Sequence, residues 1–142
     1  MSQNQIDYNR LITFLEEHDT FSHYCKIKIT KLEEGYVEAQ ADMENGICQN
    51  YFNGLHGGFM ATMTDLLAGT AALSYGKMCM TLQSNLNCIR SVSSGIIRGV
   101  GKVLHHGRTT AVVDAYLYDD QDRLICKATY TMFIKDQTLV LD

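Results

Sequence analysis

The segment over residues 57–74, GGFMATMTDLLAGTAALS, restricts the possible folds more than any other part of the chain. Nearly every residue in it is apolar or small, and its one ionisable side chain is Asp65. Ala, Met and Leu favour a helix, whereas Thr, Asp and Gly69 interrupt the apolar run, which is also too short to span a bilayer. Because a helix that is apolar all round is buried on all sides, the sequence predicts a central buried helix over residues 57–74.

Segments with a period of two lie on both sides of this helix and predict strands. From Cys25 the pattern places Ile27 and Ile29 on one face, and a turn-like segment ends at Gly35. The return strand has one apolar side, which consists of Val37, Ala39, Ala41 and Met43. Four β-branched or alternating segments follow the helix, and their short connections predict an antiparallel meander over residues 80–90, 95–107, 109–119 and 123–134.

The order of these segments predicts an α+β fold in a single domain over residues 1–142. Residues 6–18 have apolar side chains at helical spacing, so a short amphipathic helix is expected within an N-terminal lead-in over residues 1–24. No proline, Gly/Ser-rich linker or internal repeat marks a second domain, and the 142 residues suffice for one core. A curved antiparallel sheet wrapped around one long central helix is the hotdog fold.

Charge and cysteine content exclude several functional classes. The formal net charge is −4, so the chain has no overall positive field for a nucleic-acid backbone. The five cysteines are scattered and form no CxxC pair, which argues against a disulfide framework or a zinc ribbon and favours reduced thiols. The N-terminus is polar and lacks an apolar signal region. We therefore expect a cytoplasmic protein that binds neither nucleic acid nor membrane.

A glycine pair, Gly57 and Gly58, opens the predicted helix. Free N–H groups at the positive end of the helix dipole suit a carbonyl oxygen or an oxyanion, although such a turn can also serve close packing alone. Asp65 favours a function, because burying an unpaired carboxylate costs several kcal/mol. The alternative is a structural Asp that pairs with a buried Thr hydroxyl or an Arg.

Helix geometry separates these two groups. Gly57 and Asp65 are eight residues apart. At a rise of about 1.5 Å per residue, their backbones lie about 12 Å apart along one helix, so one chain cannot easily apply both to one bond. Two copies with antiparallel central helices would bring Gly57 of one chain to Asp65 of the other at two equivalent sites. The sequence therefore suggests an obligate homodimer.

One set of motifs resembles the PaaI-like hotdog acyl-CoA thioesterases over residues 25–134. It consists of Asn50, Gly54, His56-Gly57-Gly58 and Asp65, the strand Thr81-Leu82-Gln83-Ser84-Asn85, and the later Gly107-Arg108. The chain departs from the family at Arg90-Ser91, where many relatives read Arg-Pro, and at Gln83, where an acidic residue is common.

The resemblance implies roles for the catalytic candidates. Gly57 and Gly58 would donate backbone N–H groups to the thioester carbonyl, and Asp65 from the partner subunit would act as base or nucleophile. Asn50 would position the water or the thioester. His56 would either hydrogen-bond near the thioester or only fix the loop, and the Thr81 hydroxyl would help to hold Asp65 or the water.

Two residues are the candidates for binding the rest of the substrate. Arg108 occupies a position that resembles those that meet the phosphates of coenzyme A, and a solvated turn is the alternative. Gln83 is the second candidate. The adjacent His105 and His106 point to opposite faces of a strand and do not suggest a metal site.

The expected function is hydrolysis of an acyl-CoA to a free acid and coenzyme A, without metal or redox cofactor. The enzyme would be a homodimer with shared sites or a homotetramer of two such dimers. A non-catalytic hotdog sensor or carrier of acyl-CoA is the main alternative, against which Asp65 speaks. A hotdog dehydratase acting on β-hydroxyacyl thioesters is a third possibility, but it needs a catalytic pair that the sequence does not identify.

Overall fold

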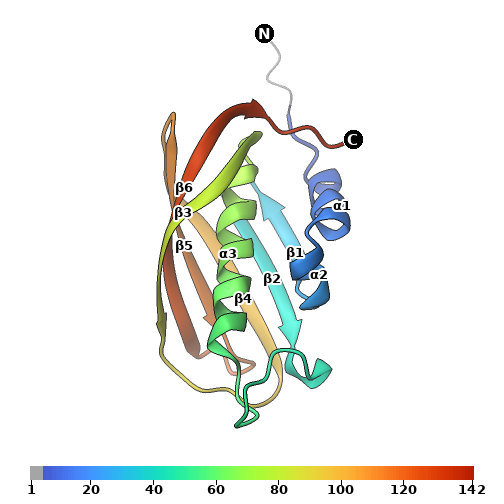
Figure 1. The fold of residues 1–142 in the computed structure, drawn as a ribbon, viewed down its shortest axis with the longest axis vertical. Coiled ribbons are helices and arrows are strands. Elements are labelled where there is room, and N and C mark those ends of the chain that lie inside the picture. The colour runs from blue at the N-terminus through green and yellow to red at the C-terminus, as the bar shows by residue number, and fades with distance from the viewer. Residues whose placement is uncertain (1–4) are drawn as a thin grey trace.

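The computed structural model describes residues 5–142, in which a six-stranded antiparallel sheet curves around a long helix (Figure 1). Residues 1–4, the start of the predicted lead-in, lie outside the described residues. The elements, in chain order, are α1 (Tyr8–His18), α2 (Thr20–Tyr24), β1 (Lys28–Glu33), β2 (Tyr36–Asp42), η1 (Met43–Asn45), α3 (Gly57–Leu73), β3 (Lys77–Cys88), β4 (Ile96–His106), β5 (Thr110–Tyr118) and β6 (Leu124–Thr138). This arrangement confirms the predicted hotdog fold.

The amphipathic helix of the lead-in is confirmed, and a second short helix follows it. Asp7 caps α1 by accepting a hydrogen bond from the backbone N–H of Arg10 at 3.1 Å. Asp19 ends α1 and caps α2 through the N–H of Ser22 at 3.1 Å. The two helices lie beside β1, an edge strand of the sheet (Figure 1). Helix α2 was not predicted, because its five residues are too few to show a periodic pattern.

The first hairpin has the predicted faces, but its first strand begins later than predicted. Lys26 has a left-handed backbone with φ 55°, which delays the strand to Lys28. The apolar side of the return strand is buried as predicted, and its last member, Met43, lies in the 3-10 turn η1.

The predicted four-strand meander is wrong at its first connection. The order across the sheet is β1-β2-β4-β5-β6-β3, so only β4, β5 and β6 form a meander. β3 pairs with β6 at the far edge, and the connection over residues 89–95 crosses to β4, which pairs with β2. Seven extended residues can span roughly 25 Å, which is enough for this crossing. Strand periodicity identifies a strand but does not identify its neighbours.

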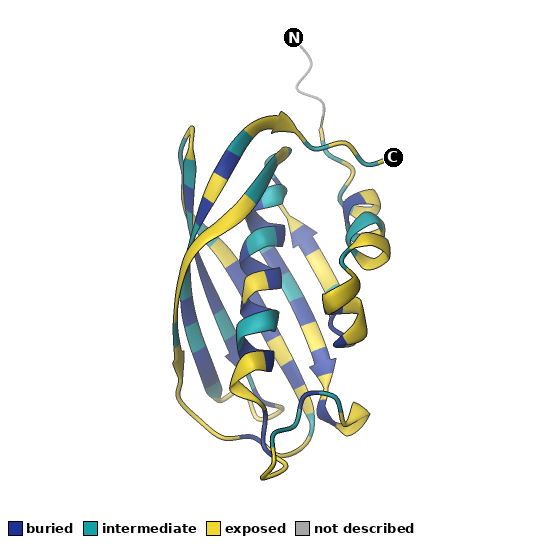
Figure 2. Cartoon of the chain, viewed as in Figure 1, coloured by how far each residue is buried: buried dark blue, intermediate teal, exposed yellow. Residues whose placement is uncertain are grey.

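The central helix α3 packs on the inner face of the sheet through residues that are almost fully buried. Among them are Met63, Leu67, Ala68 and Ala71, each fully buried. The predicted burial on all sides is wrong for a single chain, because a stripe of small and polar residues stays open (Figure 2). This stripe is Gly58, Ala61, Thr62, Asp65, Gly69 and Leu73.

Strand β3 is the exposed edge of the sheet. None of its twelve residues is buried, and most are exposed, as Figure 2 shows. Large apolar side chains are among them, since Met80 is 49% and Leu82 is 58% exposed. A long open edge of this kind offers unpaired backbone groups to another strand. No helix within residues 5–142 has the length and apolar character needed to cross a membrane.

Candidate functional site

The loop before α3 is shaped by the side chain of Asn50. Its Oδ1 accepts hydrogen bonds from the backbone N–H groups of Phe52 at 2.9 Å and Gly54 at 3.0 Å. A Cβ on Gly54 would lie 3.2 Å from Oγ of Ser91, so Ser91 would have to shift to admit a side chain there. The side-chain oxygen of Asn50 is therefore used by the loop itself. The side-chain nitrogen, Nδ2, has no hydrogen-bond partner within the described part of the chain.

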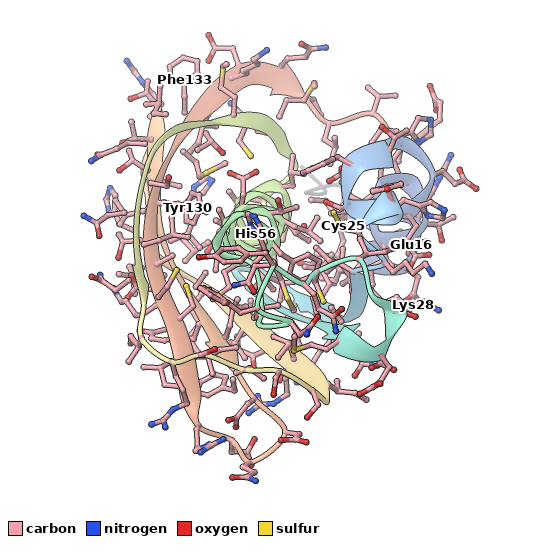
Figure 3. The ribbon with its side chains drawn as sticks, turned by 60° about the horizontal axis from the view of Figure 1, so that its bottom comes forward. Glu16, Cys25, Lys28, His56, Tyr130 and Phe133 are labelled. Carbon is pink, nitrogen blue, oxygen red and sulfur yellow. The ribbon has the colours of Figure 1, made fainter. Side chains whose placement is uncertain are left out.

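His56 caps the start of α3. Its Nδ1 accepts a hydrogen bond from the backbone N–H of Gly58 at 2.8 Å, so the N–H of the imidazole ring is on Nε2. Figure 3 shows His56 at the near end of the helix. This bond supports the expectation that His56 fixes the loop, and it occupies the N–H of Gly58, which the sequence analysis offered to a ligand.

Gly57 is the open backbone donor at this helix start. Its N–H has no acceptor among residues 5–142, and a Cβ placed on Gly57 would meet no atom within 4 Å. A free N–H at the positive end of a 17-residue helix is suited to bind a partly negative oxygen. Of the glycine pair, Gly57 thus has the geometry of a donor and Gly58 serves the cap.

Asp65 lies two turns further along α3, exposed in a single chain. Thr81 on β3 donates a hydrogen bond from Oγ1 to Asp65 Oδ1 at 2.7 Å. Burial and, to a smaller extent, the Asp65 carboxylate raise the pKa of the neighbouring Cys79 thiol to about 11. The structure therefore brings Thr81 and Asp65 together, and it removes the burial cost that the sequence analysis assigned to Asp65.

A bulge in β3 changes which residues face α3. The ladder with β6 shifts register between Thr81 and Gln83, so Thr81 lies opposite Met132 and Gln83 opposite Thr131. Met132 is buried on the inner face and its neighbour Thr131 points to the outer face. Gln83 therefore lies on the outer side of the sheet, and Ser84 takes its place on the inner side.

An open depression of about 350 Å³ adjoins Asp65. Its lining residues come from α2, α3, β3 and β6, and they are Asp19, Phe21, Ser22, Ala61, Thr62, Asp65, Ser84 and Tyr130. Tyr130 reaches from β6 toward α3 (Figure 3), and burial raises the pKa of its hydroxyl to about 12. The sequence did not indicate that α2 and Ser84 line this depression, because α2 has no periodic pattern and the bulge in β3 is not visible in the sequence.

Arg108 is not close to these residues within one chain. It lies exposed in the turn between β4 and β5, two residues after His106. The ring of His106 stacks on Tyr75 at 3.9 Å, beyond the C-terminal end of α3. Gly57 lies at the other end of the helix, which is about 25 Å long. Within one chain, Arg108 and Gly57 are therefore associated with opposite ends of α3.

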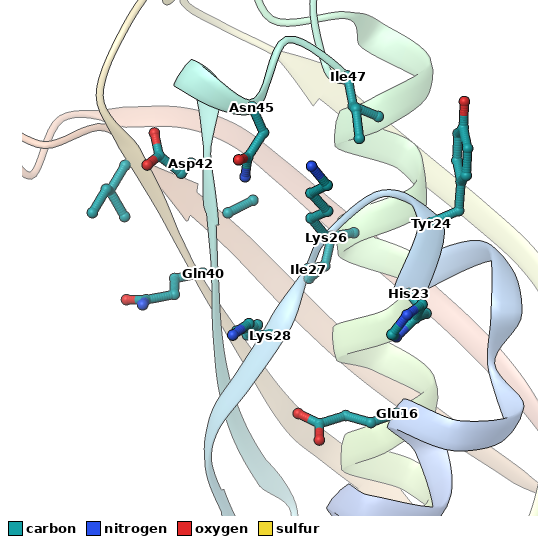
Figure 4. Close-up of a pocket in the computed structure, with 12 residues that line it drawn as sticks. Glu16, His23, Tyr24, Lys26, Ile27, Lys28, Gln40, Asp42, Asn45 and Ile47 are labelled. Carbon is teal, nitrogen blue, oxygen red and sulfur yellow. The ribbon is translucent and has the colours of Figure 1, made fainter.

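A second open depression lies away from all these residues. It has a volume of about 790 Å³ and is formed by α1, α2, β1, β2 and the segment after β2 (Figure 4). Glu16, His23, Lys26, Lys28 and Asp42 give it charges of both signs. It contains none of the predicted site residues.

Comparisons with known proteins identify the family and agree with the fold. The family model described as thioesterase superfamily matches residues 52–126, slightly more than half of the chain. The proofreading thioesterase EntH of Klebsiella pneumoniae is 32% identical over 111 residues, which are 76% of this chain and 80% of that protein.

Two solved structures have a similar fold. A hypothetical thioesterase protein with coenzyme A from Streptococcus pneumoniae TIGR4 has a TM-score of 0.81 at 29% identity, covering 88% of this chain and 99% of that chain. The PaaI protein from the phenylacetic acid degradation operon of E. coli has a TM-score of 0.84 and covers 94% of this chain and 96% of that chain. At 17% identity, the likeness to PaaI concerns the fold alone.

Proposed function

This chain belongs to the thioesterase superfamily and is a thioester hydrolase, and from that premise we propose that it hydrolyses an acyl-CoA to a free acid and coenzyme A. The similar thioesterase from Streptococcus pneumoniae, which was solved with coenzyme A, supports a CoA thioester as substrate. The single observation that carries the proposed mechanism is the Asp65 carboxylate, which Thr81 holds at 2.7 Å beside an open depression.

The proposed reaction uses a backbone donor and a carboxylate. The N–H of Gly57 would polarise the thioester carbonyl and stabilise the oxyanion that forms when water adds to the carbonyl carbon. Asp65 would take the proton of that water as a general base, or would attack the carbonyl carbon itself as a nucleophile. In the first case the C–S bond then breaks and coenzyme A leaves with that proton on its sulfur. In the second case coenzyme A leaves as a thiolate and the acyl group stays on Asp65 as a mixed anhydride; water then hydrolyses the anhydride, which releases the free acid and supplies the proton for the thiolate.

The proposed active unit is a homodimer. Gly57 and Asp65 lie about 12 Å apart on one helix, too far to act on one thioester carbonyl. The open stripe of α3, four of whose six residues are Gly, Ala or Thr, would allow a second α3 to approach closely in the antiparallel direction. The exposed edge of β3 would pair with β3 of the partner subunit and continue the sheet. Each of the two sites would then use Gly57 from one chain and Asp65 from the other.

The test is release of coenzyme A from short, medium, long and aromatic acyl-CoAs by the wild type and by Asp65→Asn. Coenzyme A should be quantified by chromatography, because the five native cysteines react with thiol dyes. Asp136→Asn, an exposed carboxylate near the end of β6, is the matched control. We expect Asp65→Asn to lose hydrolysis while it keeps the wild-type fold and assembly, and Asp136→Asn to retain activity.

Two results would contradict the proposal. Equal turnover by the wild type and by Asp65→Asn would show that Asp65 does not carry the chemistry. Tight binding of an acyl-CoA without hydrolysis of any member of the panel would instead favour the sensor or carrier function.

A further inference from the structure

Cys88 and Cys126 lie directly opposite each other on the paired strands β3 and β6, although 38 positions separate them in the sequence. The backbone N–H of Ile89 donates to the carbonyl oxygen of Ile125 at 2.8 Å. Ile89 and Ile125 are the ladder neighbours of Cys88 and Cys126. Hydrogen-bonded and non-hydrogen-bonded pairs alternate along an antiparallel ladder, so the cysteines form a non-hydrogen-bonded pair, in which the Cα atoms are about 4.5 Å apart and the side chains are closest. Disulfides usually join Cα atoms about 4.4 to 6.8 Å apart. The two cysteines therefore have the backbone spacing of a disulfide without any strand movement.

The two thiols differ in exposure. Cys126 is fully buried on the inner face of the sheet, whereas Cys88, at the end of the edge strand, is exposed. Residues directly opposite in a ladder point to the same face, so the Cys88 side chain extends over Cys126. Burial and the adjacent Cys88 thiol raise the pKa of Cys126 to about 12. An oxidant in solution therefore reacts first with Cys88, and the Cys126 thiol lies next to it.

The other three cysteines lack this arrangement. Cys79 also points inward from β3, but it lies opposite Ile134. Cys25 and Cys48 are both buried and neither belongs to a strand ladder. Of the five thiols, all within the described residues, only Cys88 and Cys126 face each other across paired strands.

We propose that Cys88 and Cys126 are a site of reversible oxidation, at which hydrogen peroxide converts the two thiols to a cross-strand disulfide. Peroxide transfers one oxygen atom to the Cys88 sulfur, which becomes a sulfenic acid, and one water leaves. The Cys126 sulfur then attacks the Cys88 sulfur, the S–S bond forms and the second water leaves. The two thiols lose two electrons and two protons in total, and the peroxide accepts them. A dithiol reductant reverses the reaction by thiol–disulfide exchange.

The position of the pair links it to the candidate active site. The segment after Cys88 supports the loop that precedes α3, because the N–H of Leu55 donates to the carbonyl oxygen of Val92 at 2.7 Å. Ser91 of the same segment lies against Gly54. A covalent link at Cys88 anchors the start of this supporting segment to β6, the strand next to the edge strand β3.

The experiment is titration of the reduced protein with hydrogen peroxide, followed by intact mass measurement and peptide mapping without reductant. We expect the loss of two hydrogen atoms per chain and one linked peptide that joins Cys88 to Cys126. Because the link closes a long loop of the unfolded chain, the Tm should rise by at least about 5 °C and return to its original value with dithiothreitol.

Three variants test the assignment. Cys88→Ser and Cys126→Ala should each abolish the linked peptide and the rise in Tm, and Cys88→Ser changes only an exposed side chain, so its fold is preserved. Cys79→Ala, on the same strand, should retain both. A link between other cysteines, or overoxidation of Cys88 to sulfinic acid without any link, would overturn the proposal. Neither the linked peptide nor the Tm depends on acyl-CoA hydrolysis, so this test is independent of the proposed function.

Discussion

At the scale of single residues, the hydrogen bond between Thr81 and Asp65 determines how the carboxylate is presented. The Oγ1–Oδ1 distance of 2.7 Å is that of a charge-assisted bond, which is stronger than a bond between neutral groups. Both residues are exposed in a single chain, so the bond contributes little to folding. Its main effect is to hold Asp65 in one orientation.

We predict that Thr81→Val lowers kcat for acyl-CoA hydrolysis roughly tenfold, because the carboxylate loses its fixed orientation. KM should change little, and the free energy of unfolding should stay within about 0.5 kcal/mol of the wild type, since the site is exposed. Thr81→Ser keeps the hydroxyl and should restore kcat. Steady-state kinetics of the three proteins measure the effect. Wild-type kcat in Thr81→Val would show that Thr81 does not position Asp65.

The residue types of the candidate site and the contact of Thr81 with Asp65 could be anticipated from the sequence, but the partner of the Gly58 N–H could not. Spacing and chemistry indicated Gly57 and Asp65, and the structure leaves both accessible. The same reasoning treated Gly58 as a second donor, whereas its N–H is used by His56. Whether the Gly58 N–H is free depends on the rotamer of the His56 imidazole, and no pattern of residue types indicates that rotamer.

At the scale of elements, α3 is fixed to the sheet by a buried polar contact. The Tyr130 hydroxyl on β6 lies 2.8 Å from Oγ1 of Thr64 and 3.1 Å from the carbonyl oxygen of Ala61. Tyr130 is 2% exposed and Thr64 is fully buried. The contact sets the position of α3, and thereby of Asp65, one residue after Thr64.

Removing this hydroxyl tests the link between helix and sheet. Tyr130→Phe should lower the free energy of unfolding by about 1 kcal/mol, because Thr64 keeps its bond to the carbonyl oxygen of Met60 and stays partly satisfied. Tyr118→Phe, a half-buried tyrosine on β5, is the control and should be neutral within about 0.5 kcal/mol. Urea unfolding measures both variants. Equal stability of Tyr130→Phe and the wild type would show that the contact does not stabilise the packing of α3.

Strands β5 and β6 are joined on their outer side by Asp114. Its Oδ1 accepts hydrogen bonds from Thr129 at 2.8 Å and from Lys127 at 3.2 Å. Burial alone would raise the pKa of Asp114, but these bonds and the charge of Lys127 outweigh burial and lower it below its ordinary value. The folded state therefore binds this proton more weakly than the unfolded state does.

The sign of the pH effect follows from this difference. The contribution of Asp114 to stability is fully present above the unfolded pKa of about 4 and is lost as the pH falls through the lower folded pKa. We predict that Asp114→Asn lowers the free energy of unfolding by about 1 to 2 kcal/mol at pH 7 and that the difference shrinks below about pH 4. Urea unfolding at several pH values measures it, with the exposed Asp120→Asn as control. A difference that is independent of pH would contradict the linkage.

Most elements could be predicted from periodicity, whereas their pairing could not. The apolar run specified α3 to within one residue, since the helix ends at Leu73. The position of β3 next to β6, and the bulge that replaces Gln83 by Ser84 on the inner face, depend on contacts between distant segments. For the same reason, the sequence did not indicate that Cys88 and Cys126 face each other, because residues 38 positions apart form no local pattern.

At the scale of the whole molecule, the exposed features of one chain are those that the proposed dimer would bury. The sequence analysis expected α3 to be buried on all sides, and the single chain leaves the stripe around Asp65 open. The unpaired edge of β3 lies beside that stripe, since Thr81 contacts Asp65. The apolar and small residues of α3 agree with burial in a dimer, which composition alone cannot distinguish from burial within one chain.

A complementation experiment tests the shared site. Gly57→Val adds a side chain where the single chain has open space, so it should fold while blocking the approach of a thioester to the backbone N–H. Gly57→Val and Asp65→Asn should each be inactive as homodimers. When equal amounts are unfolded together and refolded, half of the dimers are mixed, and each mixed dimer has one site with an intact Gly57 and an intact Asp65. We expect about a quarter of wild-type activity. Asp65→Asn refolded alone is the control, and a mixture that stays inactive would mean that each chain builds its site by itself.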